Sequence, residues 1–183
     1  GALQGFLLGS TGIKLLRKCP RPVWITQPQV EREIKSILVA HDLRPVGDLA
    51  MELGCSMAEL QNAQLHVVHA TEYPEVDYMF PASVSAERKQ AYRDEAETHI
   101  QTQLVGADLP APAKVHFVTE PPDLAIMNCV EQHAIDLLVM GTVGRTGIAG
   151  FITGNTPERV LPRIPCSLLA VKPPEFQSPV SIG

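Results

Sequence analysis

The sequence predicts an open, twisted α/β fold in which a five-stranded parallel sheet carries helices on both faces. Short apolar runs alternate with amphipathic segments from residue 34 onward, which is typical of parallel sheets with right-handed crossovers. The run 135–141 is continuously apolar, as expected of a central strand covered on both sides. A glycine-rich loop then separates this run from a short helical segment.

Each element of this fold has its own signal along residues 34–173. The segment EIKSILVAH predicts the first strand, and apolar residues three and four apart predict a helix over 45–62. The expected order continues with a strand at 64–70, a loop at 72–84, a helix at 85–105, strands at 114–119 and 135–141 around a helix that ends at His133, a helix near 155–163 and a strand at 167–173. Ligands of such sheets bind beyond the carboxyl ends of the strands, where the strand order reverses. The glycine-rich loop follows the fourth strand, so we expect the site there.

The chain also contains an internal repeat. The segment GFLLGSTGIKLLRKCP, which begins at Gly5, matches GFITGNTPERVLPRIP, which begins at Gly150. We therefore expect a C-terminal remnant of an earlier domain at 1–26, a linker at 27–33, a complete domain at 34–173 and a C-terminal tail at 174–183. The chain begins without Met, so we expect it to be part of a longer tandem protein. PVWI at 22–25 corresponds to SLLAV at 167–171, and we expect these strands to pair within one chain or between two.

Composition narrows the class of partners. The net charge is −5 at pH 7 and 45% of the residues are hydrophobic. This balance disfavours nucleic acid, because neutralising phosphates needs a basic surface. No apolar run approaches the roughly 18 residues of a membrane span. The four cysteines, which form no C-x-x-C pair, indicate free thiols and a cytoplasmic location. They are Cys19, Cys55, Cys129 and Cys166.

The motif with the most chemical information is GTVGRTGIAGFITGNT at 141–156. It has the pattern G-x-x-G, nine residues, then G-N-T. Glycine permits a positive φ and the close approach of a ligand. Gly154, Asn155 and Thr156 open a short helix, whose free N–H groups and positive end suit a phosphate. Asn155 or Thr156 can instead cap the helix. Arg145 is placed either to meet phosphates or to lie in solvent.

This motif resembles the glycine motif of the universal stress protein family, whose nucleotide-binding members carry G-x-x-G, nine residues, then G-S/T. LLVMGTVGRTGIAGFITGNTPERVLPRIPCSLLAVKP resembles that family's C-terminal signature, and ILVAHDL resembles its first strand. GFLLGSTGIKLLRKCPRPVWI is similar to the same signature from a preceding domain. The resemblance implies a Rossmann-like fold of the adenine nucleotide alpha hydrolase type. It also implies adenine nucleotide binding, with ATP, with or without Mg²⁺, as the cofactor and with little or no catalysis, in stress response or signalling.

The resemblance also assigns the site. It places adenine and ribose against Ala40, His41 and Asp42, and the base against Ala70. Gly141, Gly144 and Gly154 match the motif glycines, which implies phosphate contacts there and at Asn155. Thr156 offers a hydroxyl at the next position, and Arg145, beside the loop, stays open between phosphate and solvent. Asn155 stands where the family has Ser or Thr, and its amide still donates to a phosphate oxygen but lacks the hydroxyl. The preceding domain, or a second copy, is implied as a partner of the last strand.

Two other functions stay open. The Asn155 departure favours a nucleotide-independent dimerisation or scaffold module, or a binder of another small or apolar ligand. An enzyme of the related hydrolase group needs a serine- and glycine-rich loop after the first strand, which HDLRPVGD at 41–48 does not resemble. We do not expect His41 and Asp42 to act as a catalytic pair, because adjacent residues at a strand end rarely face each other.

The sequence predicts no metal site. His66 and His69 lie three apart on a predicted strand, so their side chains point to opposite faces of the sheet. Asp123 and Glu131 are expected on the solvent side of their helix, where acidic side chains are well hydrated.

Overall fold

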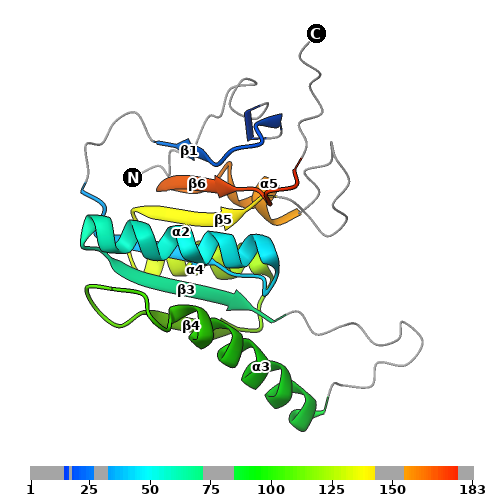
Figure 1. Ribbon diagram of the computed structural model, residues 1–183. Helices are drawn as coiled ribbons and strands as arrows, with labels where there is room; N and C mark the ends of the chain where they lie inside the picture. The colour runs from blue at the N-terminus through cyan, green and yellow to red at the C-terminus, as the bar shows by residue number, and fades with distance from the viewer. Residues whose placement is uncertain (1–14, 17, 27–32, 72–84, 143–154, 177–183) are drawn as a thin grey trace.

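The structure is a computed structural model that describes residues 15–16, 18–26, 33–71, 85–142 and 155–176. Within these residues, one six-stranded sheet has the order β1-β6-β5-β2-β3-β4 (Figure 1). The strands are β1 (Val23–Ile25), β2 (Ser36–Ala40), β3 (Gln64–Ala70), β4 (Lys114–Val118), β5 (Leu137–Gly141) and β6 (Ser167–Val171). The helices are α2 (Pro45–Gln61), α3 (Ala86–Leu104), α4 (Pro122–Gln132) and α5 (Asn155–Val160).

The topology confirms the predicted α/β class. Strands β2 to β6 are mutually parallel. The chain builds outward from β2 through β3 to β4, and then crosses back to place β5 and β6 on the other side of β2. The strand order therefore reverses between β2 and β5, which makes the carboxyl ends of these two strands the switch point of the sheet.

A sixth strand extends the predicted sheet of five. β1 pairs with β6 in antiparallel register, with Val23 opposite Ala170 and Ile25 opposite Leu168. The expected pairing of PVWI with SLLAV is thus confirmed, and it occurs within one chain. Leu16, which precedes β1, is buried, and its carbonyl accepts a hydrogen bond from the Lys172 ammonium. β1 therefore covers a sheet edge that would otherwise present unpaired backbone groups.

Helices cover both faces of the sheet: α2 and α3 lie on one side, and α4 and α5 on the other (Figure 1). Because side chains alternate along a strand, Ile37 and Val39 pack under α2, whereas Leu38 packs under α4. Full burial of one such side chain contributes about 1.5–3 kcal/mol. The continuous apolar run of β5 is explained in the same way, since Leu137 and Leu138 contribute to opposite cores.

Helix α2 approaches the sheet closely because it carries glycine at the point of contact. A β-carbon at Gly54 would lie 2.3 Å from Cγ2 of Val39. The helix begins with Pro45, which is favoured at the first helical position because its missing N–H has no intrahelical partner there. It ends at Gln61 and is followed by Asn62, whose φ of 52° is the left-handed conformation common after helices.

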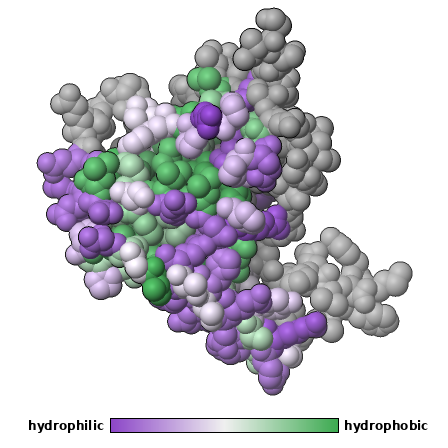
Figure 2. All heavy atoms as spheres, in the orientation of Figure 1, coloured by the Kyte–Doolittle hydropathy of each residue, from purple (hydrophilic) through white to green (hydrophobic). Residues whose placement is uncertain are grey.

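The two helices on this face differ in character. Only Ala96 and Ile100 of α3 are buried, and Figure 2 shows α3 as largely hydrophilic, while hydrophobic side chains gather beside α2, over β5 and β6. Among the helices that the structure describes, none has the length and apolar character needed to cross a membrane.

Candidate functional site

The switch point brings together the two strand ends that the sequence assigned to the site. Ala40, the last residue of β2, lies beside Met140, and β5 ends one residue later at Gly141. The connections from these strands leave in opposite directions, toward β3 and toward β6. Crevices at such points are the usual ligand sites of open α/β sheets.

Two small side chains line the same side of this edge. Ala40 and Ala70 both pack against the core under α4, and both are partly exposed. Ala70 lies two residues beyond Val68, which pairs with Ala40. The structure therefore places the two predicted base-contacting residues on one face and at one edge, where alanine leaves room for a flat group.

Asp42 is held over the first turn of α2. The backbone N–H of Arg44 donates to its Oδ1 atom at 3.2 Å. A β-carbon at Gly47 would lie 2.5 Å from the same oxygen, so glycine is what lets the carboxylate lie there. Leu43, between Asp42 and Arg44, has a φ of 59°, a conformation uncommon outside glycine. Asp42 is exposed, and this tight turn presents its carboxylate at the carboxyl edge near the positive end of α2.

The ring of His41 is turned away from the edge. It is buried, its Nδ1 atom accepts the Leu43 N–H at 3.0 Å, and its Nε2 atom lies 3.0 Å from Oε1 of Gln103. Since Nδ1 is an acceptor, the proton of the neutral ring is on Nε2 and is donated to Gln103. Burial lowers the pKa of His41, against the raising effects of Gln103 and Asp48. His41 thus shapes the turn that carries Asp42.

The sequence analysis missed the group that surrounds this ring. Oδ1 of Asp48 lies 2.8 Å from Nε2 of His99 and 3.3 Å from Nε2 of His41, and it also accepts from the Gln103 amide. Burial raises the pKa of Asp48, but the hydrogen bonds from His99 and Gln103 outweigh it and the pKa is lowered. His99 and Gln103 are four residues apart and so share one face of α3. This spacing was the feature of the sequence that could have indicated the group.

His41, Asp48 and His99 each offer a ligand atom, and the three atoms lie within 4.8 Å of one another. Their hydrogen bonds to Gln103 already use His41 Nε2 and Asp48 Oδ1. A metal would have to displace the Gln103 side chain, so the geometry describes a network that joins α2 to α3.

The end of β5 is fixed by packing as well as by hydrogen bonds. A β-carbon at Gly141 would lie 2.9 Å from Cγ1 of Val46, so Gly141 has a structural role under α2. Thr142 is buried, and both its N–H and its hydroxyl donate to the carbonyl of Val171. Helix α5 begins at Asn155, as the sequence predicted. The remaining motif positions, Gly144, Arg145 and Gly154, lie outside the described residues, as does the side chain of Asn155.

The prediction that Asp123 lies on the solvent side of its helix is wrong. Asp123 is 8% exposed, and its two carboxylate oxygens lie 3.6 Å from Arg159 Nη1 and 3.7 Å from Arg163 Nη2. These ion pairs join the first turn of α4 to α5 and the turn that follows it. Glu131 is exposed, as predicted. Asp123 therefore helps to place the helix that follows the glycine loop.

His66 and His69 lie on opposite faces, as their spacing predicts. Nδ1 of His69 donates to the carbonyl of His41 at 2.9 Å, which ties β3 to the turn after β2. His66 lies on the other face, where its Nδ1 atom is 3.1 Å from Nε2 of His116 and its ring is 4.6 Å from that of His133. The sequence analysis considered only His69 as a neighbour of His66. It therefore missed His116 and His133, which other elements bring to His66.

The strand order and its reversal between β2 and β5 define an α/β protein of the Rossmann-like class. The family model described as "Universal stress protein family" matches residues 33–172. The chain belongs to the universal stress protein family, and this membership supports a function in the stress response.

Individual relatives agree with this assignment. The chain is 29% identical to Universal stress protein E of Salmonella typhi and 28% identical to that of Escherichia coli K12, over 98% of this chain in each case. It spans 60% of the length of each of these curated relatives.

Solved structures show the same fold. A Pseudomonas aeruginosa UCBPP-PA14 protein assigned to the universal stress proteins matches with a TM-score of 0.73 and 27% identity, over 96% of this chain and 60% of that one. A universal stress protein solved in complex with cAMP matches with a TM-score of 0.53 and 23% identity, over 76% of this chain and 98% of that one.

Proposed function

We propose that this domain binds an adenine nucleotide, with ATP as the expected ligand, in stress signalling and with little or no turnover. The observation that carries the proposal is the position of Asp42. This exposed carboxylate is held by a tight turn at the switch point of the sheet, where α/β proteins of this topology bind their ligands.

The proposed binding mode follows the shape of the edge. Ala40 and Ala70 leave space for the flat base, and the Asp42 carboxylate accepts hydrogen bonds from ribose hydroxyls. The glycine loop over 141–154 and the start of α5 receive the phosphates through backbone N–H groups, since glycine permits close approach of the backbone. Asn155 donates its amide where related sequences use a hydroxyl.

Low turnover is part of the proposal for a chemical reason. Phosphoryl transfer requires positioned metal ligands and a group that orients the nucleophile. At this edge of the described part of the chain, Asp42 is exposed, but the nearby Asp48 is already held by His99 and Gln103. Asp48 is therefore not available as a second metal ligand.

The choice of an adenine nucleotide is supported by a structural neighbour that was solved in complex with cAMP.

A titration with a fluorescent ATP analogue tests the proposal. Wild type should bind one equivalent saturably, and Gly144→Glu should bind at least about tenfold more weakly, because a carboxylate beside the phosphates costs more than about 1.4 kcal/mol. Gln101→Glu adds the same charge to the exposed face of α3 and should bind like wild type. Equal binding by all three proteins, or none by wild type, would defeat the nucleotide proposal.

One observation favours a second role. β1 and β6 are the strands that the internal repeat makes equivalent, and they pair antiparallel, as strands related by a twofold axis do. We propose that residues 1–26 derive from a preceding domain and that this pairing organises the tandem. An absence of nucleotide binding would leave this scaffold role as the leading function.

A further inference from the structure

Three histidines from three elements converge on the α4 side of the sheet. His66 lies on β3, His116 on β4 and His133 at the residue that follows α4. Each offers one ring nitrogen, and the three nitrogens lie within 4.8 Å of one another. The His133 ring lies 4.6 Å from that of His66 and 4.7 Å from that of His116, measured between ring centroids.

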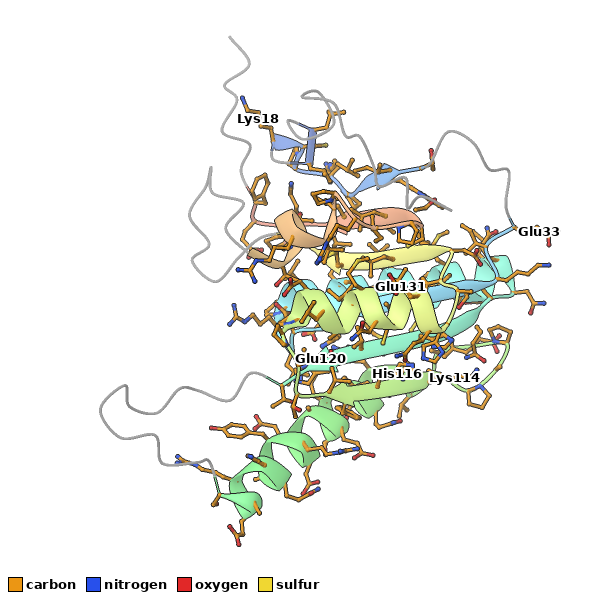
Figure 3. All side chains as sticks on the ribbon, turned by 180° about the vertical axis from the view of Figure 1, so that it is seen from behind. Lys18, Glu33, Lys114, His116, Glu120 and Glu131 are labelled. Carbon is orange, nitrogen blue, oxygen red and sulfur yellow. The ribbon has the colours of Figure 1, made fainter. Side chains whose placement is uncertain are left out.

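The topology explains how residues so far apart in sequence meet. Val68 packs in the core under α4, and in the parallel pairing of β3 with β4 it lies opposite His116. His66 lies two residues before Val68 on β3, so the side chains of His66 and His116 are both on the α4 side of the sheet. Helix α4 runs back from the carboxyl edge and ends at the amino edge, where His133 follows it. Figure 3 labels His116 on β4 between Lys114, at the amino end of the strand, and Glu120, beyond its carboxyl end. The cluster therefore lies at the opposite end of the sheet from the proposed nucleotide site.

The spacing of the ring nitrogens suits one small transition metal ion. Nδ1 of His66 lies 3.1 Å from Nε2 of His116. Two nitrogen ligands of one tetrahedral Zn²⁺, each about 2.0–2.1 Å from the metal, are about 3.3 Å apart. Imidazole nitrogens suit Zn²⁺ and neighbouring first-row metals, whereas Mg²⁺ and Ca²⁺ prefer oxygen.

His66 and His116 share a hydrogen bond in the metal-free protein, so the ring that donates must move its proton to its other nitrogen before both rings can bind a metal. Neutral rings permit this exchange. Burial, followed by the effects of His133, His116 and Lys114, lowers the pKa of His66 to about 4. Burial also lowers the pKa of His116, with contributions from His133 and Lys114. Neutral imidazole is the form that binds metal. His66 is only 3% exposed, but the other two rings are half-buried, so solvent has access to a fourth position.

We propose that His66, His116 and His133 form a Zn²⁺ site, with water or a ligand from a partner in the fourth position. The metal joins β3 and β4 to the end of α4. The proposal is independent of nucleotide binding, because no residue is shared between the two sites.

Zinc binding to the whole chain, after removal of metals with a chelator, tests this inference. Calorimetry at pH 7.5 should give one equivalent of Zn²⁺. His133→Gln and His116→Gln should each lose at least about tenfold in affinity, since loss of even outer-shell partners costs that much at metal sites. His99→Gln is the matched control, because His99 is also half-buried and belongs to the other histidine-containing group, and it should bind like wild type.

Substitution of Co²⁺ for Zn²⁺ gives an absorption spectrum that depends on metal ligation and not on packing alone. Co²⁺ should produce ligand-field absorption without a thiolate charge-transfer band, and His133→Gln should weaken that absorption while keeping the urea midpoint of metal-free wild type. A thiolate band would assign the metal to a cysteine and overturn the proposal. So would the absence of stoichiometric Zn²⁺, or an equal loss of affinity in His99→Gln.

Discussion

The carboxylate of Asp42 lies where a β-carbon on Gly47 would have to be, with only 2.5 Å between that position and Oδ1. The backbone N–H of Asp42 would also be crowded, at 3.2 Å. A glycine inside a helix normally costs about 1 kcal/mol relative to alanine. Here the glycine has a different role, because the absence of a β-carbon leaves room for the Asp42 carboxylate at the switch point.

Gly47→Ala should therefore separate stability from ligand binding. The added methyl group displaces the Asp42 carboxylate, while the higher helix propensity of alanine compensates for the crowding, so we expect the urea midpoint to change little. Affinity for the ATP analogue should fall by about tenfold or more, since a hydrogen bond to a charged group contributes about 1.5–3 kcal/mol. Asp42→Asn should show a similar loss in the same titration.

The matched control for these variants is Glu97→Gln, which removes one negative charge from the exposed face of α3. Its affinity should equal that of wild type. If Asp42→Asn and Glu97→Gln bind alike, Asp42 does not contact the ligand.

Gly54→Ala should have the opposite character, because its methyl group would enter the core. The nearest atom, Cγ2 of Val39, would lie 2.3 Å away and belongs to a β-branched side chain on a buried strand. Overpacking of this kind typically costs 1–3 kcal/mol. Urea unfolding should show a loss of about that size, and the affinity of the folded fraction for the ATP analogue should be unchanged. A gain in stability would show that α2 is free to shift.

The sequence predicted the fold well because strands buried on both faces have an unambiguous apolar signature. The strand predicted at 64–70 is observed with the same bounds. The strand predicted over 135–141 starts later, at Leu137. The carboxylate of Asp136 instead accepts hydrogen bonds from the backbone N–H groups of Lys35 and Ser36. Apolar patterning does not report such a polar cap at the amino edge.

The site was predictable only as far as strand ends define it. Parallel strands end at one edge, so Ala40, Asp42 and Gly141 could be placed together from the sequence. The direction of the His41 ring could not, because it depends on Gln103, which α3 brings from a distant part of the chain. The burial of Asp123 likewise depends on a helix that follows it in the chain.

Asp123→Asn should loosen the junction between α4 and α5. The change removes the ion pairs to Arg159 and Arg163 and a charge favourable to the first turn of α4. Both arginines are more than half exposed and become hydrated, so the expected loss is only about 1 kcal/mol by urea unfolding. Glu131→Gln, an exposed change near the other end of α4, should be neutral or slightly stabilising. Equal effects of the two changes on stability would contradict the role of Asp123 in joining α4 to α5.

Stability should also decline as the pH falls below about 6.5, the ordinary pKa of histidine, and His41 should contribute to that decline. Its pKa is lowered by burial, although Asp48 and Asp42 favour its charged form and His99 opposes it. The unfolded chain therefore takes up a proton before the folded chain does, so the stability present above pH 6.5 is lost toward the folded pKa. One proton gives a slope of at most about 1.4 kcal/mol per pH unit. In metal-free protein, urea unfolding between pH 7.5 and 5.5 should give a shallower decline for His41→Gln than for wild type. Parallel declines would mean that His41 titrates alike in both states.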